Sequence, residues 1–329
     1  MSEQQELMSV DEVKTRLGNL DFWCEDVEIG KARFASMPVV EGSRLGYYRN
    51  DRCLPISDRG GLLNIIGIPP NALKEYENDE DLINRMIQHS TQKRATDVVR
   101  FTGTSTKVLG IEQSKGDWVS PQEVFDLVCD EINPVGVASA DFYYNYYLMR
   151  IVGVQHMELA RNRGDITHSG LAVKLNGSVQ IGPYCYRMVC SNGMMQAYEE
   201  LETLHSREMS LVEIRNIVQA QQVRATDLVS RFLSLDTVPA GQNREQVIIR
   251  LAQEFELPQS FTTNVLERLP ALGDDATMYD LVNVATQTAQ ASKIQKDKLQ
   301  IRLGEMTYAL AENYTRCDSC GARLTALEN

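Results

Sequence analysis

The sequence predicts an α+β fold, in which a strand-rich central domain with packed helices is followed by a helical C-terminal part. Between residues 95 and 193, short apolar stretches alternate with polar positions and are separated by Gly, Asn and Ser turns, as in β-strands. From residue 194 onward, apolar residues recur at helical spacing instead. A run of strands followed by a run of helices is typical of α+β proteins.

We expect four segments, because a chain of 329 residues is long for a single core. They are a mixed N-terminal region (1–94), an α+β core (95–193), a helical region (194–312) and a C-terminal tail with a Cys-x-x-Cys motif (313–329). The sequence has no apolar run of about 18 residues and no signal peptide in "MSEQQELMSV". Its seven cysteines are irregularly spaced, which fits a reducing compartment, so we expect a cytoplasmic protein without membrane contact.

Two helices are predicted in the N-terminal region. "LPISDRGGLLNIIGIPP" indicates a turn, a short helix and then a break, because Pro69 and Pro70 cannot continue a regular element. "NDEDLINRMIQHSTQK" predicts a longer helix, whose apolar face is formed by Leu82, Ile83, Met86 and Ile87.

The core begins with a predicted hairpin, "DVVRFTGTSTKVLGIEQ", and continues with a helix. Ser120 is a candidate N-cap, Pro121 stands at the first helical position, and Glu123 completes a capping box. "DFYYNYYLMRIVG" then predicts one strand, and "SGLAVKLNGSVQIGPYCYRMVC" predicts two strands around an Asn-Gly turn.

Helices are predicted for the rest of the chain. The first begins at "MMQAYEELETL", directly after the last strand of the core. The others are "QVIIRLAQEF", "MYDLVNVATQTA" and "KDKLQIRLGEMTYALAEN", each of which repeats apolar residues at helical spacing.

The net charge of −12 is unevenly distributed. Residues 1–80 carry nine basic and fifteen acidic side chains, residues 81–190 carry eleven of each, and residues 191–329 carry thirteen and nineteen. Acidity argues against strong non-specific nucleic-acid binding, which depends on Lys and Arg neutralising phosphates. Any phosphate contact is therefore expected in the middle of the chain.

The segment "RMVCSNGMM" places a cysteine before an Asn-Gly turn. A structural role is expected for Arg187, Cys190, Asn192 and Gly193, because Asn-Gly supplies the positive φ that ends a strand. The competing hypothesis is an enzyme with Cys190 or Asn192 in its site, which requires a nearby base that the sequence does not place. The chain carries no recognised catalytic signature, so a non-enzymatic role is favoured.

The motif "CDSCG" offers two thiolates, Cys317 and Cys320, with the spacing of a zinc-binding half site. A tetrahedral zinc site needs two more ligands, which could come from Cys185 with Cys190, from Cys24, from a histidine or from another subunit. A redox pair and an exposed tail without a metal are the alternatives. Zinc at this motif is the cofactor that the sequence suggests.

The segment "DFYYNYYLMR" is dense in tyrosine. On a single strand Phe142, Tyr144 and Tyr146 would share a face, where aromatic rings can stack with bases while basic side chains hold phosphates. The alternative is that the tyrosines pack between layers, as strand residues commonly do. The candidate nucleic-acid contacts are Phe142, Tyr144, Tyr146, Arg150, Arg161, Arg163 and Lys174.

"RMVCSNGMM" also resembles a phage- and plasmid-encoded family catalogued as the domain of unknown function numbered nine-three-two. Members share a hairpin like "HSGLAVKLNGSVQIGPYCY", a helix start like "VSPQEVFDLV" and a downstream Y-x-x-x-N-x-x-T helix, here Tyr279, Asn283 and Thr286. The likeness spans about residues 95–290 and excludes the acidic N-terminal region and "CDSCG". It implies an α+β domain from a mobile element or virus, among genes of DNA metabolism, without a defined reaction.

The leading hypothesis is therefore a phage- or mobile-element-type protein of DNA metabolism that binds single-stranded DNA and promotes annealing. Annealing proteins usually self-assemble, so a homo-oligomer is expected. The alternative is a non-catalytic structural or partner-binding phage protein, which the acidic balance also suits.

Overall fold

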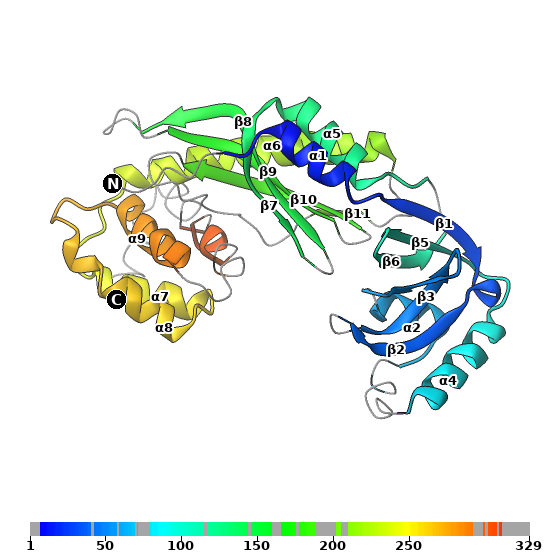
Figure 1. Cartoon of the computed structure of the whole chain (residues 1–329). Coiled ribbons are helices and arrows are strands. Elements are labelled where there is room, and N and C mark those ends of the chain that lie inside the picture. Colours follow the sequence, from blue (N-terminus) through cyan, green and yellow to red (C-terminus); the bar gives the residue numbers. More distant parts are fainter. Residues whose placement is uncertain are drawn as a thin grey trace.

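The computed structural model describes residues 7–40, 43–57, 59–69, 71, 79–114, 117–143, 146–159, 166–175, 178–187, 202–204, 210–291, 299, 302–307 and 309–310. The elements form three parts arranged along a curve (Figure 1): an N-terminal lobe, a central sheet and a group of C-terminal helices. The fold is α+β with a helical C-terminal part, as predicted. No helix in the described part of the chain is long and apolar enough to cross a membrane.

In its described residues, the N-terminal lobe packs two small antiparallel sheets and the two helices named below around one apolar core. Its elements are β1 (Trp23–Glu28), η1 (Ile29–Lys31), β2 (Phe34–Val40), β3 (Ser43–Arg49), β4 (Arg52–Pro55), α2 (Arg59–Ile66), α4 (Glu80–Lys93), β5 (Val98–Thr104) and β6 (Lys107–Gln113). The strand orders are β1-β5-β6 and β2-β3-β4. The Tyr47 and Phe101 rings, one from each sheet, stack with centroids 4.2 Å apart and thereby join the sheets.

Two elements of this lobe confirm the sequence patterns. The predicted hairpin is β5 and β6, which pair antiparallel. The predicted helix is α4, which buries Ile83 and Ile87. The expected boundary at residue 94, however, separates β1 from β5, and these strands pair with Trp23 opposite Gly103.

The central sheet is antiparallel, with strand order β11-β10-β9-β8-β7. Its strands are β7 (Pro134–Phe142), β8 (Tyr147–Glu158), β9 (Ile166–Leu175), β10 (Val179–Arg187) and β11 (Glu202–Leu204). One face is covered by α1 (Val10–Gly18), α5 (Pro121–Ile132) and α6 (Leu211–Ser234), as Figure 1 shows. Buried side chains from both layers, such as Met149 and Val173 from the sheet and Phe125 and Val218 from the helices, form the core between them.

Helices α5 and α6 both begin with a capping box. The Ser120 hydroxyl accepts the backbone N–H of Glu123 at 3.2 Å, and the Glu123 carboxylate accepts the N–H of Ser120 at 2.8 Å, as predicted. Ser210 and Glu213 repeat this arrangement at the start of α6. Each box satisfies two backbone donors that a helix leaves open.

The C-terminal helices pack against the far end of the central sheet. They are α7 (Arg244–Glu254), α8 (Gln259–Leu266) and α9 (Met278–Ala291), with short turns η3 (Leu235–Thr237) and η4 (Leu269–Ala271). Residues 302–307 are helical as well. Their apolar core includes Leu159, directly after β8, and Cys185 from β10, which fix the helices to the sheet.

Two predictions for the core and the region after it are wrong. The expected strand at "DFYYNYYLMR" is a hairpin: β7 ends at Phe142, β8 begins at Tyr147, and these two residues pair. The helix expected to run to residue 204 does not, because Glu202–Leu204 form β11 and pair with β10. Tyrosine favours strands but does not reveal where a strand reverses.

Candidate nucleic-acid interface

The turn between β7 and β8 presents two neighbouring tyrosines at one end of the central sheet. Tyr143 donates its backbone N–H to the carbonyl oxygen of Tyr146 at 2.9 Å, which closes the turn. The two rings lie with centroids 4.5 Å apart and planes inclined by 34°. Tyr143 is 38% exposed, so an aromatic surface faces the solvent.

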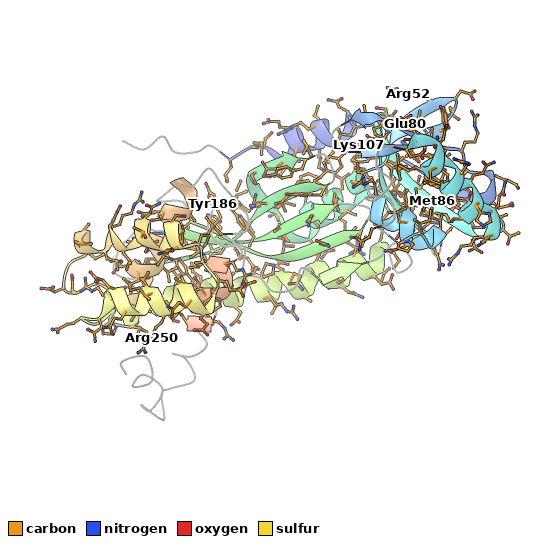
Figure 2. The ribbon with its side chains drawn as sticks, turned by 90° about the horizontal axis from the view of Figure 1, so that it is seen from below. Arg52, Glu80, Met86, Lys107, Tyr186 and Arg250 are labelled. Carbon is orange, nitrogen blue, oxygen red and sulfur yellow. The ribbon has the colours of Figure 1, made fainter. Side chains whose placement is uncertain are left out.

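Two lysines from other strands lie against this turn. The Nζ of Lys174, on β9, is 4.9 Å from the centroid of the Tyr146 ring. The Nζ of Lys107, on β6, donates to the Tyr143 carbonyl at 3.2 Å and lies 5.7 Å from the Tyr147 ring centroid. Figure 2 shows Lys107 near the N-terminal lobe's end of the sheet. We name Tyr143, Tyr146, Lys107 and Lys174 the tyrosine tip.

The tyrosine tip combines two kinds of chemistry. Cation–π attraction holds each ammonium group close to a ring without neutralising its charge. An exposed ring offers a flat surface on which a base can stack, and an ammonium group beside it can contact a phosphate. A single-stranded nucleic acid presents both groups along its length.

Of the seven predicted contacts, Tyr146 and Lys174 belong to the tyrosine tip. Phe142 lies on the helix-covered face, with its ring edge-on to Tyr147 at 5.4 Å and beneath the Arg16 guanidinium at 4.5 Å. It therefore does not share a face with Lys174, contrary to the alternation expected of one strand.

Arg150 shares the helix-free face with Lys174 but is only 5% exposed. Its guanidinium donates to the Ser139 hydroxyl at 2.8 Å and to the Asp141 carboxylate at 3.2 Å. Both partners lie on β7, so Arg150 ties β8 to its neighbour. The remaining predicted contacts, Tyr144, Arg161 and Arg163, lie outside the described residues.

Arg187, the first residue of the proposed structural motif, joins β10 to α9. Its guanidinium donates to the Asn283 side-chain oxygen at 2.9 Å and lies 5.1 Å from the Tyr279 ring centroid. Thr286 donates to the carbonyl oxygens of Val282 and Asn283 at 2.9 Å. Two separate motifs of the family resemblance thus meet in one buried contact. Cys190, Asn192 and Gly193 lie outside the described residues.

The zinc prediction concerns Cys317 and Cys320, which also lie outside the described residues. Within the described ranges, no group of three or more His, Cys, Asp or Glu side chains is placed to hold a metal ion. Burial raises the pKa of Cys185 to about 12 and that of Cys24 to about 11. Both environments disfavour the thiolate, which is the form that binds zinc.

Two residues of the tyrosine tip escaped the sequence reasoning. Lys107 follows a hairpin turn in the N-terminal lobe, 36 residues before Tyr143, and only the folded chain brings them together. Tyr143 was expected on the opposite strand face from Tyr146. The one local signal for a turn between Tyr143 and Tyr146 is Asn145, because Asn is the only residue in "FYYNYY" that favours turns.

Comparisons with known proteins returned no matching family model, no matching curated protein and no matching solved structure. The resemblance to the phage and plasmid family therefore rests on the motifs quoted above.

Proposed function

We propose that this chain binds single-stranded DNA through the tyrosine tip and serves in the DNA metabolism of a phage or mobile element, where it promotes annealing. The observation that carries the proposal is the pairing of an exposed tyrosine turn with two lysines from separate parts of the fold. Self-assembly into a homo-oligomer belongs to the same proposal, because annealing needs many short contacts along one strand.

The charge distribution supports a local contact. The tyrosine tip lies within residues 81–190, the segment in which basic and acidic side chains balance. The acidic flanks repel phosphates, so a bound strand is expected to follow the tip and to avoid the rest of the surface. Two lysines predict moderate affinity per subunit.

The proposal is tested by fluorescence anisotropy of a labelled single-stranded oligonucleotide at low salt. Tyr146→Ala is expected to weaken binding about tenfold, because stacking of one base contributes about 1–3 kcal/mol. Lys174→Gln is expected to weaken it as well, through the loss of a phosphate contact.

The matched controls are Tyr48→Ala and Lys93→Gln. Tyr48 is also half-buried beneath a cation, with the Arg33 guanidinium 4.8 Å from its ring, but it lies on β3. Lys93 is exposed at the end of α4. Equal losses in the controls and in the tip variants would contradict a site at the tyrosine tip.

A further inference from the structure

The pairing of β8 with β9 is interrupted at the end of the central sheet that meets the C-terminal helices. Residues 153–155 of β8 stand opposite Ser169 alone, and the regular pairing resumes with His156 opposite His168. Such a bulge takes its extra residues out of the hydrogen-bond ladder. Their carbonyl oxygens therefore need donors from elsewhere.

Side chains bond all three carbonyl oxygens of this bulge. His168 Nδ1 lies 3.0 Å from the first oxygen, on Gly153, and His156 Nδ1 lies 3.1 Å from the second, on Val154. The Ser169 hydroxyl donates to the third at 3.3 Å. A carbonyl oxygen can only accept, so each Nδ1 carries a hydrogen and the neutral form of each ring is protonated there. We name His156 and His168 the histidine pair.

The bulge directs the end of β8 toward the helices. The side-chain oxygen of Gln155, within the bulge, accepts the Thr226 hydroxyl of α6 at 2.9 Å. Beyond the bulge, Met157 packs against the apolar core of the C-terminal helices, and Leu159 is a member of that core. The bonds that hold the bulge therefore also hold the joint between the sheet and these helices.

The two imidazole rings lie close together in different environments. Their centroids are 5.2 Å apart, and His168 is only 7% exposed whereas His156 is exposed. Burial lowers the pKa of His168 below the 6.5 of an ordinary histidine. The Gly153 carbonyl opposes this effect by favouring the charged ring, while a charge on His156 adds to the lowering of the pKa.

The other ionisable groups around His168 in the described part of the chain have less influence. Tyr186 stands opposite it on β10, near the C-terminal helices (Figure 2), and stays neutral because burial raises its pKa. Glu158 lies two residues beyond His156 and is exposed, so solvent screens its charge. Arg187 faces the other side of the sheet, where it contacts α9. Helices α5 and α6 also cover that other side.

We propose that the histidine pair makes the joint between the central sheet and the C-terminal helices sensitive to acid. When both rings are protonated, two like charges lie side by side and one of them is buried, which is unfavourable. The His168 ring then leaves the Gly153 carbonyl for solvent, and the bulge loses one of its three donors. Met157 and Leu159, which follow the bulge, lose their fixed position against the helices.

The direction of the pH dependence follows from the lowered pKa of His168. The folded protein binds this proton more weakly than the unfolded chain, so the contribution to stability is complete well above pH 6.5 and is lost as the pH falls below it. For one such group, the unfolding equilibrium constant rises by up to about tenfold between pH 8 and pH 5.5. Urea denaturation at the two pH values measures this change.

The variant His168→Asn keeps a side-chain N–H for the Gly153 carbonyl but does not titrate. Its unfolding constant is expected to lack the rise that the wild type shows between pH 8 and pH 5.5. The matched control is His89→Asn, because His89 is exposed on α4, and it should behave as the wild type. Carboxylates affect all three proteins alike. The same rise in His168→Asn as in the wild type would overturn the proposal.

An NMR titration of the wild-type imidazole signals gives a reading that does not depend on whether His168→Asn folds. The His168 signal is expected to titrate below pH 6.5, and in His156→Asn its midpoint should move upward, because a neighbouring charge is removed. Titration of His168 at or above pH 6.5 contradicts the proposal.

Hydrogen exchange locates the opening within the molecule. After correction for the intrinsic effect of pH, the end of β8 and helix α9 are expected to lose protection at pH 5.5, while β5 and β6 keep theirs. An equal loss of protection in β5 and β6 would mean that acid unfolds the whole chain and that the histidine pair does not act on the joint.

Discussion

At the scale of single residues, the contact between Arg187 and Asn283 ties the central sheet to the C-terminal helices. Both side chains are buried, and the guanidinium donates to the amide oxygen at 2.9 Å. Asn283→Ala leaves a buried cation without this acceptor. We expect the free energy of unfolding to fall by about 1–3 kcal/mol, measured by urea denaturation.

Asn243→Ala is the control for this change, because Asn243 precedes α7, is exposed, and makes no side-chain capping bond. Its expected effect is within about 0.5 kcal/mol. Similar values for the two variants would mean that the Arg187 contact does not hold α9 to the sheet.

At the scale of elements, the start of α5 determines how the helix layer meets the central sheet. Ser120 caps the helix and Glu123 closes the box, while Phe125 and Val128 face the core one turn later. Ser120→Ala is expected to destabilise the protein by about 1 kcal/mol, since the N–H of Glu123 loses its acceptor. Ser120→Asp keeps an acceptor and should restore most of this loss; a thermal unfolding series that ranks the two variants equally would contradict the role of the cap.

Elements with local signals are also those that the sequence predicted. The Ser120 box, the α4 periodicity and the β5–β6 hairpin each lie within about fifteen residues and need no distant partner. The pairing of β1 with β5 joins residues 70 to 80 positions apart, and no local pattern marks it. The pairing of β1 was missed for this reason, whereas the β2-β3-β4 sheet was missed although its strands follow one another directly in the sequence.

The candidate site also contains residues with and without a local sequence signal. Tyr146 and Lys174 were predicted because they are an aromatic and a basic side chain in segments with a strand pattern. The tyrosine turn was misread as one strand, and Lys107 comes from another lobe. Only the assembled fold brings Lys107 to the tyrosine turn.

At the scale of the whole molecule, the arrangement along a curve places the tyrosine tip where two parts meet (Figure 1). The net charge of −12 limits electrostatic attraction to that place. The account therefore predicts a protein that prefers single strands over duplex, since stacking on the tyrosines needs unpaired bases. It also predicts that the association constant for single-stranded DNA falls only slightly as the salt concentration rises, because few phosphates are contacted.

The most direct test measures the dissociation constants for single-stranded and duplex DNA over a series of salt concentrations. With two lysine contacts, the logarithm of the association constant for the single strand should fall with the logarithm of salt with a slope of about −1.4, since each contacted phosphate contributes about −0.7. Binding of the single strand should exceed that of the duplex, and Lys174→Gln should reduce the slope by about half. A slope near zero, a preference for duplex, or no binding at low salt would contradict the account and favour a structural or partner-binding role.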